Sequence, residues 1–181
     1  MKLSNATNRL VKLGLLTALS ILLVFLIHFP IFPSAAYLEY DMADVPILIG
    51  TFLFGPWWGL LLTAAVSVLQ WLLVSQASMW VGAVMHFCAT GSCVLVAGLL
   101  YRRLHTRKGA VLALVLGAAA QVLMMIPLNL IFTVHFNGAP HDVVVAMLPT
   151  VIIPFNAIKA GGNALLTFLL YKSAGRLLRL F

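Results

Sequence analysis

Residues 151–166 read Val-Ile-Ile-Pro-Phe-Asn-Ala-Ile-Lys-Ala-Gly-Gly-Asn-Ala-Leu-Leu, an apolar stretch that contains one charged residue, Lys159. The other ten of the chain's 11 basic residues lie at the boundaries of hydrophobic segments. A lysine near the middle of a bilayer costs about 3 kcal/mol on insertion scales, so it normally faces a polar cavity or a partner. Asn156, Lys159 and Asn163 are spaced i, i+3, i+7, which places them on one helical face. The stretch therefore predicts a membrane-spanning helix that turns a polar face into a helix bundle.

The composition indicates an integral membrane protein. Of the 181 residues, 63% are hydrophobic and 8% are charged, which is too little charge to cover the surface of a soluble domain. Hydrophobic runs separated by Pro, Gly and charged residues predict an all-α bundle of six transmembrane helices, with residues 1–181 forming a single membrane domain. We expect the helices at about residues 10–29, 43–55, 57–74, 80–101, 110–133 and 147–171.

The basic residues predict the orientation of the bundle. They precede the first expected helix, join the fourth to the fifth and follow the sixth: Lys2, Arg9, Lys12; Arg102, Arg103, Arg107, Lys108; Lys172, Arg176, Arg179. Because positive residues stay inside, both termini are expected in the cytoplasm. The acidic residues then fall on the outer side, at or beside the loops 30–43 and 134–146: Glu39, Asp41, Asp44 and Asp142. The net charge of +7 is thus a topology signal, and we expect no nucleic-acid partner.

Lys159 can bind a ligand or extend its side chain to the outer interface. At about 1.5 Å per residue it lies roughly 15 Å along the helix from Pro149, a depth that a lysine side chain recovers only in part. Its asparagine neighbours on the same face favour a binding site. We therefore expect Asn156, Lys159 and Asn163 to contact a polar ligand.

Several other features leave a functional and a structural interpretation open. Asn129 follows Pro127 by two residues, where it can contact a ligand or form an interhelical hydrogen bond. His86 is more often a hydrogen-bonded core residue than a ligand. The outer loop 29–44 mixes aromatics, prolines and acids and is long enough to fold over the bundle mouth as a lid. Gly14 and Ala18 form a small-xxx-small pair that lets another helix approach closely, inside the bundle or from a partner.

Motifs of common catalytic sites are absent from the sequence. There is no G-x-x-x-x-G-K-[ST] phosphate loop, so the chain is not expected to hydrolyse ATP by itself. H-E-x-x-H, G-x-S-x-G and zinc-ligand spacing around Cys88 and Cys93 are also missing. With every acid assigned to the outer side, a proton-driven pump is disfavoured. The sequence predicts neither an enzyme nor a metal site.

Two motifs resemble the riboflavin-specific S components of energy-coupling-factor (ECF) transporters. Residues 39–50, Glu-Tyr-Asp-Met-Ala-Asp-Val-Pro-Ile-Leu-Ile-Gly, and residues 54–59, Phe-Gly-Pro-Trp-Trp-Gly, resemble that family's loop 1 and the helices after it. Residues 153–159, Ile-Pro-Phe-Asn-Ala-Ile-Lys, are similar to its sixth-helix motif. The resemblance covers nearly the whole chain.

The resemblance implies a bacterial cell-membrane protein that captures riboflavin from outside as its transported substrate, without a cofactor. It implies docking on a membrane scaffold subunit powered by two ATPase subunits, with Gly14 and Ala18 of the first helix as the docking pair. Asn129, Asn156 and Lys159 would contact the flavin ring. The loop that would cover the ribityl chain runs from Leu38 to Asp44 and includes Glu39, Tyr40 and Asp41.

One departure from the family keeps the ligand open. Many members carry a Lys-Asn pair late in the third helix, where this chain has Ser67 and Gln70. An S component or stand-alone facilitator for another vitamin is therefore an alternative. A small membrane enzyme or haem protein is a further one, based on histidines that show no ligand spacing: His28, His86, His135 and His141.

Overall fold

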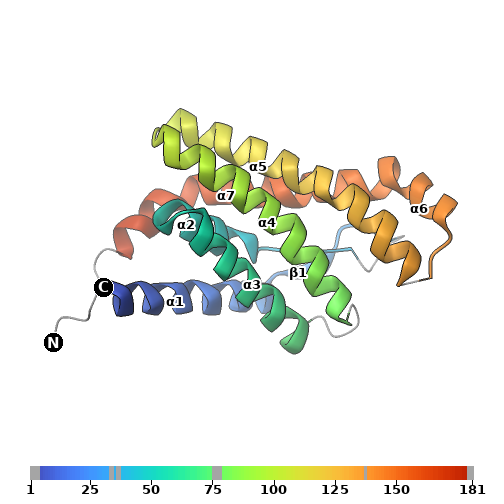
Figure 1. Cartoon of the computed structure of the whole chain (residues 1–181), viewed down its shortest axis with the longest axis horizontal. Coiled ribbons are helices and arrows are strands. Elements are labelled where there is room, and N and C mark those ends of the chain that lie inside the picture. Colours follow the sequence, from blue (N-terminus) through green and yellow to red (C-terminus); the bar gives the residue numbers. More distant parts are fainter. Residues whose placement is uncertain (1–4, 33–34, 36–37, 75–78, 137, 179–181) are drawn as a thin grey trace.

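The computed structural model describes residues 5–32, 35, 38–74, 79–136 and 138–178 as a bundle of helices with a two-stranded ribbon (Figure 1). Lys2 and Arg179 of the basic clusters lie outside these residues. The elements in chain order are α1 (Asn5–Leu26), β1 (His28–Pro30), β2 (Glu39–Asp41), α2 (Asp44–Phe54), α3 (Pro56–Leu73), α4 (Met79–Leu104), α5 (Arg107–Leu128), the π-helix η3 (Asn129–Thr133), α6 (His141–Met147), the π-helix η4 (Leu148–Ile152) and α7 (Ile153–Leu177).

Five segments of the described chain are long and apolar enough to cross a membrane: Ala6–Leu26, Pro56–Leu73, Trp80–Leu104, Arg107–Thr133 and His141–Leu177. Six transmembrane helices were expected, and α2 accounts for the difference. Its 11 residues span only about 16 Å, against about 30 Å for a bilayer core. Helix α2 is therefore an interior helix that does not cross the bilayer alone.

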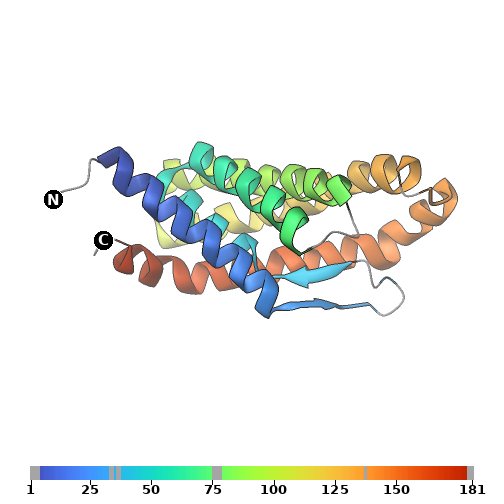
Figure 2. The same cartoon turned by 90° about the horizontal axis from the view of Figure 1, so that it is seen from below.

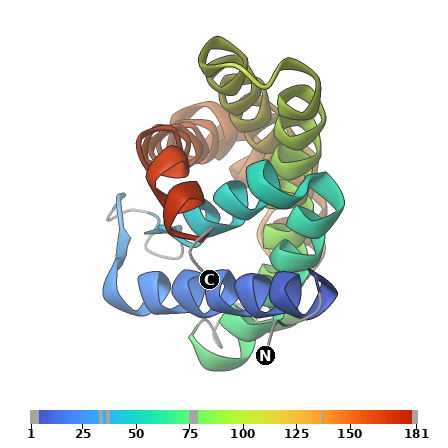
Figure 3. The same cartoon turned by 90° about the vertical axis from the view of Figure 1, so that its left-hand side faces the viewer.

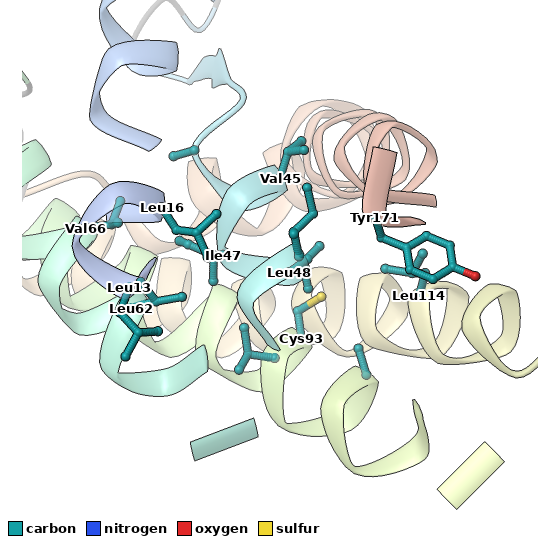
Figure 4. Close-up of a cluster of buried hydrophobic side chains, with 14 of the residues drawn as sticks. Leu13, Leu16, Val45, Ile47, Leu48, Leu62, Val66, Cys93, Leu114 and Tyr171 are labelled. Carbon is teal, nitrogen blue, oxygen red and sulfur yellow. The ribbon is translucent and has the colours of Figure 1, made fainter. Parts of the chain in front are cut away.

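The hydrophobic core is built around α2. Every residue from Asp44 to Thr51 is buried, and Figure 3 shows this helix enclosed by the longer ones. Ile47 and Leu48 pack against apolar side chains of α1, α3 and α4, such as Leu16 and Val66 (Figure 4). Because α2 is apolar on all sides, burial on all sides is the arrangement that removes most of its surface from solvent.

The Gly55-Pro56 dipeptide sets the angle between α2 and α3. Gly55 ends α2 at φ +98°, a left-handed conformation that glycine adopts without strain, and Pro56 opens α3 at a position where its missing N–H costs nothing. One turn later, a Cβ on Gly59 would collide with Thr51. The glycine allows the two helices to pack closely.

Prolines interrupt the two helices that reach the far end of the bundle. Pro127 precedes η3, and Pro149 and Pro154 lie in and after η4. Proline lacks an N–H and clashes with the carbonyl four residues earlier, so the helical ladder widens into π-turns there. The last expected helix, 147–171, consequently extends in both directions, from His141 to Leu177 through two changes of helix type.

Four helix termini lie at the same end of the bundle (Figures 1 and 2): the start of α1, the end of α4, the start of α5 and the end of α7. The other half holds α6 and the antiparallel ribbon, in which Phe29 pairs with Tyr40. The first helix ends at Leu26 and not at residue 29, because His28–Pro30 forms β1. Strand β2 then leads directly into α2, so the chain enters the bundle from this half.

Candidate ligand-binding site

A cavity of about 610 Å³ lies between the ribbon and helices α3, α4, α5 and α7. Sites for small organic ligands typically measure about 300–1,000 Å³. Its polar lining comes from every one of these elements: His28, Glu39, Asp41, Ser67, Gln70, His86, Thr90, Gln121, Asn129, Thr133, Asn156 and Lys159. The remaining lining is mainly apolar and includes Leu38, Trp71, Met125 and Phe155. The cavity can therefore hold a molecule with a large apolar body and several polar groups.

Lys159 turns its ammonium toward the ribbon. Its Nζ lies 2.7 Å from Asp41 Oδ2 and donates to the Glu39 carbonyl at 3.3 Å. The Lys159 and Asp41 side chains are 13% and 2% exposed, so the ion pair is largely shielded from solvent. A buried charge is tolerated when it is paired and hydrogen-bonded. Asp41 supplies that partner.

Asn163 fixes the ribbon and the start of α2 against α7. Its Nδ2 donates to the Asp41 carbonyl at 3.1 Å and to Asp44 Oδ2 at 3.4 Å, while its Oδ1 accepts from the Tyr40 hydroxyl at 3.2 Å. Tyr40 packs against Gly162, where an added Cβ would lie 3.2 Å from the phenolic oxygen. Burial, with a contribution from nearby Asp41, raises the pKa of the Tyr40 phenol, which keeps it a hydrogen-bond donor.

Asp44 joins four helices through one carboxylate. Oδ1 accepts from Thr90 at 2.9 Å and lies 3.2 Å from His86 Nε2, both on α4. Oδ2 accepts from Gln121 of α5 at 3.1 Å and from Asn163 of α7. The residue is 1% exposed. The network fixes the N-terminus of α2 and holds three side chains that line the cavity, His86, Thr90 and Gln121.

Asn129 and Asn156 occupy equivalent positions on two helices. Each follows a proline by two residues, and each donates from Nδ2 to a carbonyl four residues earlier, Met125 or Ile152, at 2.8 Å. Asn129 Oδ1 also accepts from Thr133 at 3.1 Å. Asn156 Oδ1 has no hydrogen-bond donor among the described residues. The π-turns thus hold two carboxamides at the cavity wall.

The sequence-predicted site residues form two layers. Six of them line the cavity: Leu38, Glu39, Asp41, Asn129, Asn156 and Lys159. Tyr40, Asp44 and Asn163 are not among the lining residues and instead form the hydrogen-bonded layer that supports it. These three residues hold the lining residues in position and do not themselves face the cavity.

Two acids are buried, which the sequence analysis did not predict. Asp41 and Asp44, expected at or beside the outer loop 30–43, are 2% and 1% exposed and contact residues of α3, α4, α5 and α7. They are buried because β2 and α2 enter the bundle. An apolar helix too short to span, with one acid just before it and another at its first residue, was the signal that could have revealed this.

Sequence reasoning noted the polar residues of the middle helices but did not foresee that they meet these acids. Ser67 lies 2.7 Å from His86 Nδ1, and Gln70 Nε2 donates to Asp41 Oδ2 at 3.3 Å. Ser67 and Gln70 share a face of α3, and His86 and Thr90 share a face of α4. That spacing was the available signal, but it did not identify the partners.

Gly14 and Ala18 lie on the outward face of α1. Both are exposed, and an added Cβ on Gly14 would meet no atom within 4 Å. The buried face of the helix carries Leu13, Leu16 and Ser20 instead. Gly14 and Ala18 therefore do not contribute to helix packing within the described bundle.

A helical membrane bundle with a partly open cavity, lined by both polar and apolar side chains, and without a phosphate loop in its sequence is the architecture of a membrane-embedded binding component. Residues 8–171 match the sequence model of the family described as "ECF transporter, substrate-specific component". The chain belongs to this family. It is thus a multi-pass membrane protein of a transport system, and the prediction that it is not an enzyme is confirmed.

Known proteins similar to the chain carry related descriptions. The riboflavin transporter RibU of Lactococcus lactis subsp. cremoris is 30% identical over 177 residues, which cover 84% of this chain and 86% of that protein. The riboflavin transporter FmnP of Bacillus subtilis is 30% identical over 160 residues, covering 84% of each. A solved structure described as "Structure and mechanism of the S component of a bacterial ECF transporter" superposes with a TM-score of 0.82 at 28% identity, covering 96% of this chain and 99% of the other.

Proposed function

We propose that this protein is the riboflavin-binding S component of an ECF transporter, which captures the vitamin from outside for ATP-driven import. The observation that carries the proposal is that Lys159, Asn129 and Asn156 line one cavity of about 610 Å³. Relatives at 30% identity are named riboflavin transporters, which supports the same ligand.

The chemistry of the cavity suits an isoalloxazine ring. The ring is large and flat, with an alternating donor and acceptor edge that carboxamides such as Asn156 can pair with. An ammonium stabilises electron density at N1 and the C2 carbonyl through a charge-assisted hydrogen bond. The apolar wall contributed by Trp71, Met125 and Phe155 would cover the hydrophobic part of the ring.

Lys159 can donate a hydrogen bond to the ligand and keep its ion pair with Asp41. An ammonium has three donors, and Asp41 Oδ2 and the Glu39 carbonyl receive two of them. The third is available to a flavin oxygen or nitrogen. On this proposal the ribbon residues from Leu38 to Asp44 cover the ribityl chain and close the site toward the outside.

The orientation in the membrane follows from the charges at the helix ends. The described basic clusters lie at the beginning of α1, the α4–α5 connection and the end of α7, which meet at one end of the bundle (Figure 1). The positive-inside rule assigns that end, with both termini, to the cytoplasm. We count six helices in the membrane domain, with α2 as the short second one. The cavity and ribbon then face the outside.

For ATP-driven import the protein must dock on partners, because it has no phosphate loop of its own. We propose a membrane scaffold subunit with two ATPase subunits. The exposed Gly14 and Ala18 of α1 are the proposed contact, since small residues let two helices approach closely in lipid.

The decisive experiment is a ligand measurement on the purified protein. We expect flavin absorption bands in the blue and near-ultraviolet after mild purification, and quenching of riboflavin fluorescence when the ligand-free protein is titrated. Thiamine and biotin should not compete. A folded protein that neither retains nor binds riboflavin would contradict the proposal. Competition by another vitamin would indicate that this vitamin is also a ligand of the site.

A further inference from the structure

Gln70 of α3 lies in the cavity wall, in a role that the proposed function does not explain. Ser67, Gln70, Trp71 and Val74 all line the cavity. Their spacing of i, i+3, i+4 and i+7 places them on one helical face. Gln70 is thus part of the surface that a ligand meets.

The side-chain amide of Gln70 is held in one orientation. Its Nε2 donates at 3.3 Å to Asp41 Oδ2, the oxygen that also accepts from Lys159 Nζ. Turning the amide by half a rotation would set its oxygen against the carboxylate, and two acceptors repel each other. Asp41 therefore determines which end of the amide is left for another partner, namely Oε1.

Gln70 Oε1 has no hydrogen-bond donor among the residues that the structure describes. Among the side chains that the structure describes, two buried polar atoms lack a partner, Gln70 Oε1 and Thr167 Oγ1, and of these two residues only Gln70 lines the cavity. Buried acceptors are nearly always paired in folded proteins, so this one calls for a donor. The terminal torsion of a glutamine is soft, so the amide can tilt to offer Oε1 to a donor in the cavity that the residue lines.

The surroundings of Gln70 select the kind of donor. Asp41 of the ribbon presents a carboxylate beside Gln70 and is paired with the Lys159 ammonium, and Glu39 adds a second carboxylate, paired with His28, to the lining of the same cavity. A phosphate group would place further hydrogen-bond acceptors beside these carboxylates, which would be unfavourable. A neutral hydroxyl group, which donates a hydrogen bond without adding negative charge, fits this wall.

We infer that Gln70 forms a hydroxyl-binding subsite, in which Oε1 accepts a hydrogen bond from the polyol chain of the ligand. The inference rests on the proposed function, because in riboflavin that polyol is the ribityl chain. Gln70 then distinguishes ligands that carry the chain from ligands that consist of the ring alone.

The test compares two ligands on two variants. Lumiflavin has the ring of riboflavin with a methyl group in place of the ribityl chain. Gln70→Met should bind riboflavin about two- to tenfold more weakly than wild type, the range for one neutral hydrogen bond, and lumiflavin with unchanged affinity. Thr167→Val is the matched control, because it removes the other unpaired buried atom away from the cavity. It should change neither affinity.

The outcomes separate the inference from the proposed function. A wild type that binds neither flavin contradicts the proposed function. A wild type that binds riboflavin, together with a Gln70→Met variant that binds both ligands normally or weakens both alike, overturns the inference alone. Gln70→Ala removes the acceptor without adding a charge beside Asp41 and tests the inference if Gln70→Met fails to fold. Its ratio of riboflavin to lumiflavin affinity should be lower than that of wild type, and an unchanged ratio contradicts the acceptor role.

Discussion

Lys159 and Asp41, which are 118 residues apart in the sequence, form an ion pair of 2.7 Å inside the helix bundle. The pair explains how an apolar helix accommodates a lysine, because a charge removed from water needs a partner. It also attaches β2 to α7. The ammonium and the strand that borders the cavity therefore hold each other in position.

Replacing Lys159 by methionine should weaken riboflavin binding by about 1.5–3 kcal/mol, the contribution of a charge-assisted hydrogen bond. The variant removes the ammonium and leaves Asp41 without its ion-pair partner. Equilibrium quenching of riboflavin fluorescence measures the affinity. Lys172→Met is the matched control on the same helix, since Lys172 is exposed, and its affinity should equal that of wild type. Unchanged affinity in folded Lys159→Met would mean that the lysine does not touch the ligand.

Asp44→Asn should destabilise the bundle by about 3 kcal/mol or more, because it replaces a buried, charge-assisted acceptor that joins four helices. An asparagine offers one acceptor oxygen, and its amide group would face the donors of Gln121 or Thr90. The melting temperature of the purified protein in detergent measures the effect. Asp142→Asn makes the same chemical change on a fully exposed side chain, and it should leave the melting temperature unaltered. Equal melting temperatures for both variants would show that the Asp44 network adds no stability.

Gly162→Ala should disturb the contact between the ribbon and α7. A Cβ at this position would lie 3.2 Å from the Tyr40 phenolic oxygen, so the ring must shift and its hydrogen bond to Asn163 weakens. We expect riboflavin affinity to fall about two- to tenfold, the range for one neutral hydrogen bond. Gly161→Ala is the neighbouring control, where a Cβ meets no atom within 4 Å. Identical titrations of the two variants would contradict a role of this contact in closing the site.

Replacing both Gly14 and Ala18 by leucine should block riboflavin uptake while the purified variant binds riboflavin with normal affinity. The two residues are exposed on α1 and are not cavity-lining residues, so bulk added there obstructs a partner helix and not the ligand. Radiolabelled uptake is measured in cells that co-express the scaffold and ATPase subunits. Ala119→Leu on the exposed face of α5 serves as the control. Full uptake by the double variant would contradict the docking assignment, and loss of binding would indicate internal packing.

Much of the bundle follows from local sequence. The predicted segments 57–74 and 80–101 correspond to α3 and α4 to within three residues, because apolar length and the flanking Gly, Pro and basic residues are local properties. The polar face of Asn156, Lys159 and Asn163 likewise follows from the helical period. The continuation of the last helix back to His141 was not foreseen, since Pro149 and Pro154 ordinarily mark a helix start and here sit within or beside a π-turn.

The sequence by itself determined that this protein is a membrane helix bundle and that Lys159 needs a polar partner, because hydrophobicity and helical period act over a few turns of chain. Only the tertiary structure decided that the partner is Asp41 and that Asp44 is buried among residues 42 to 119 positions away. The physical reason is that α2 is too short to cross a bilayer and apolar on every side. Burying it in the bundle brings inside Asp41, just before the helix, and Asp44, its first residue, and each must find hydrogen-bond donors on helices that are distant in sequence.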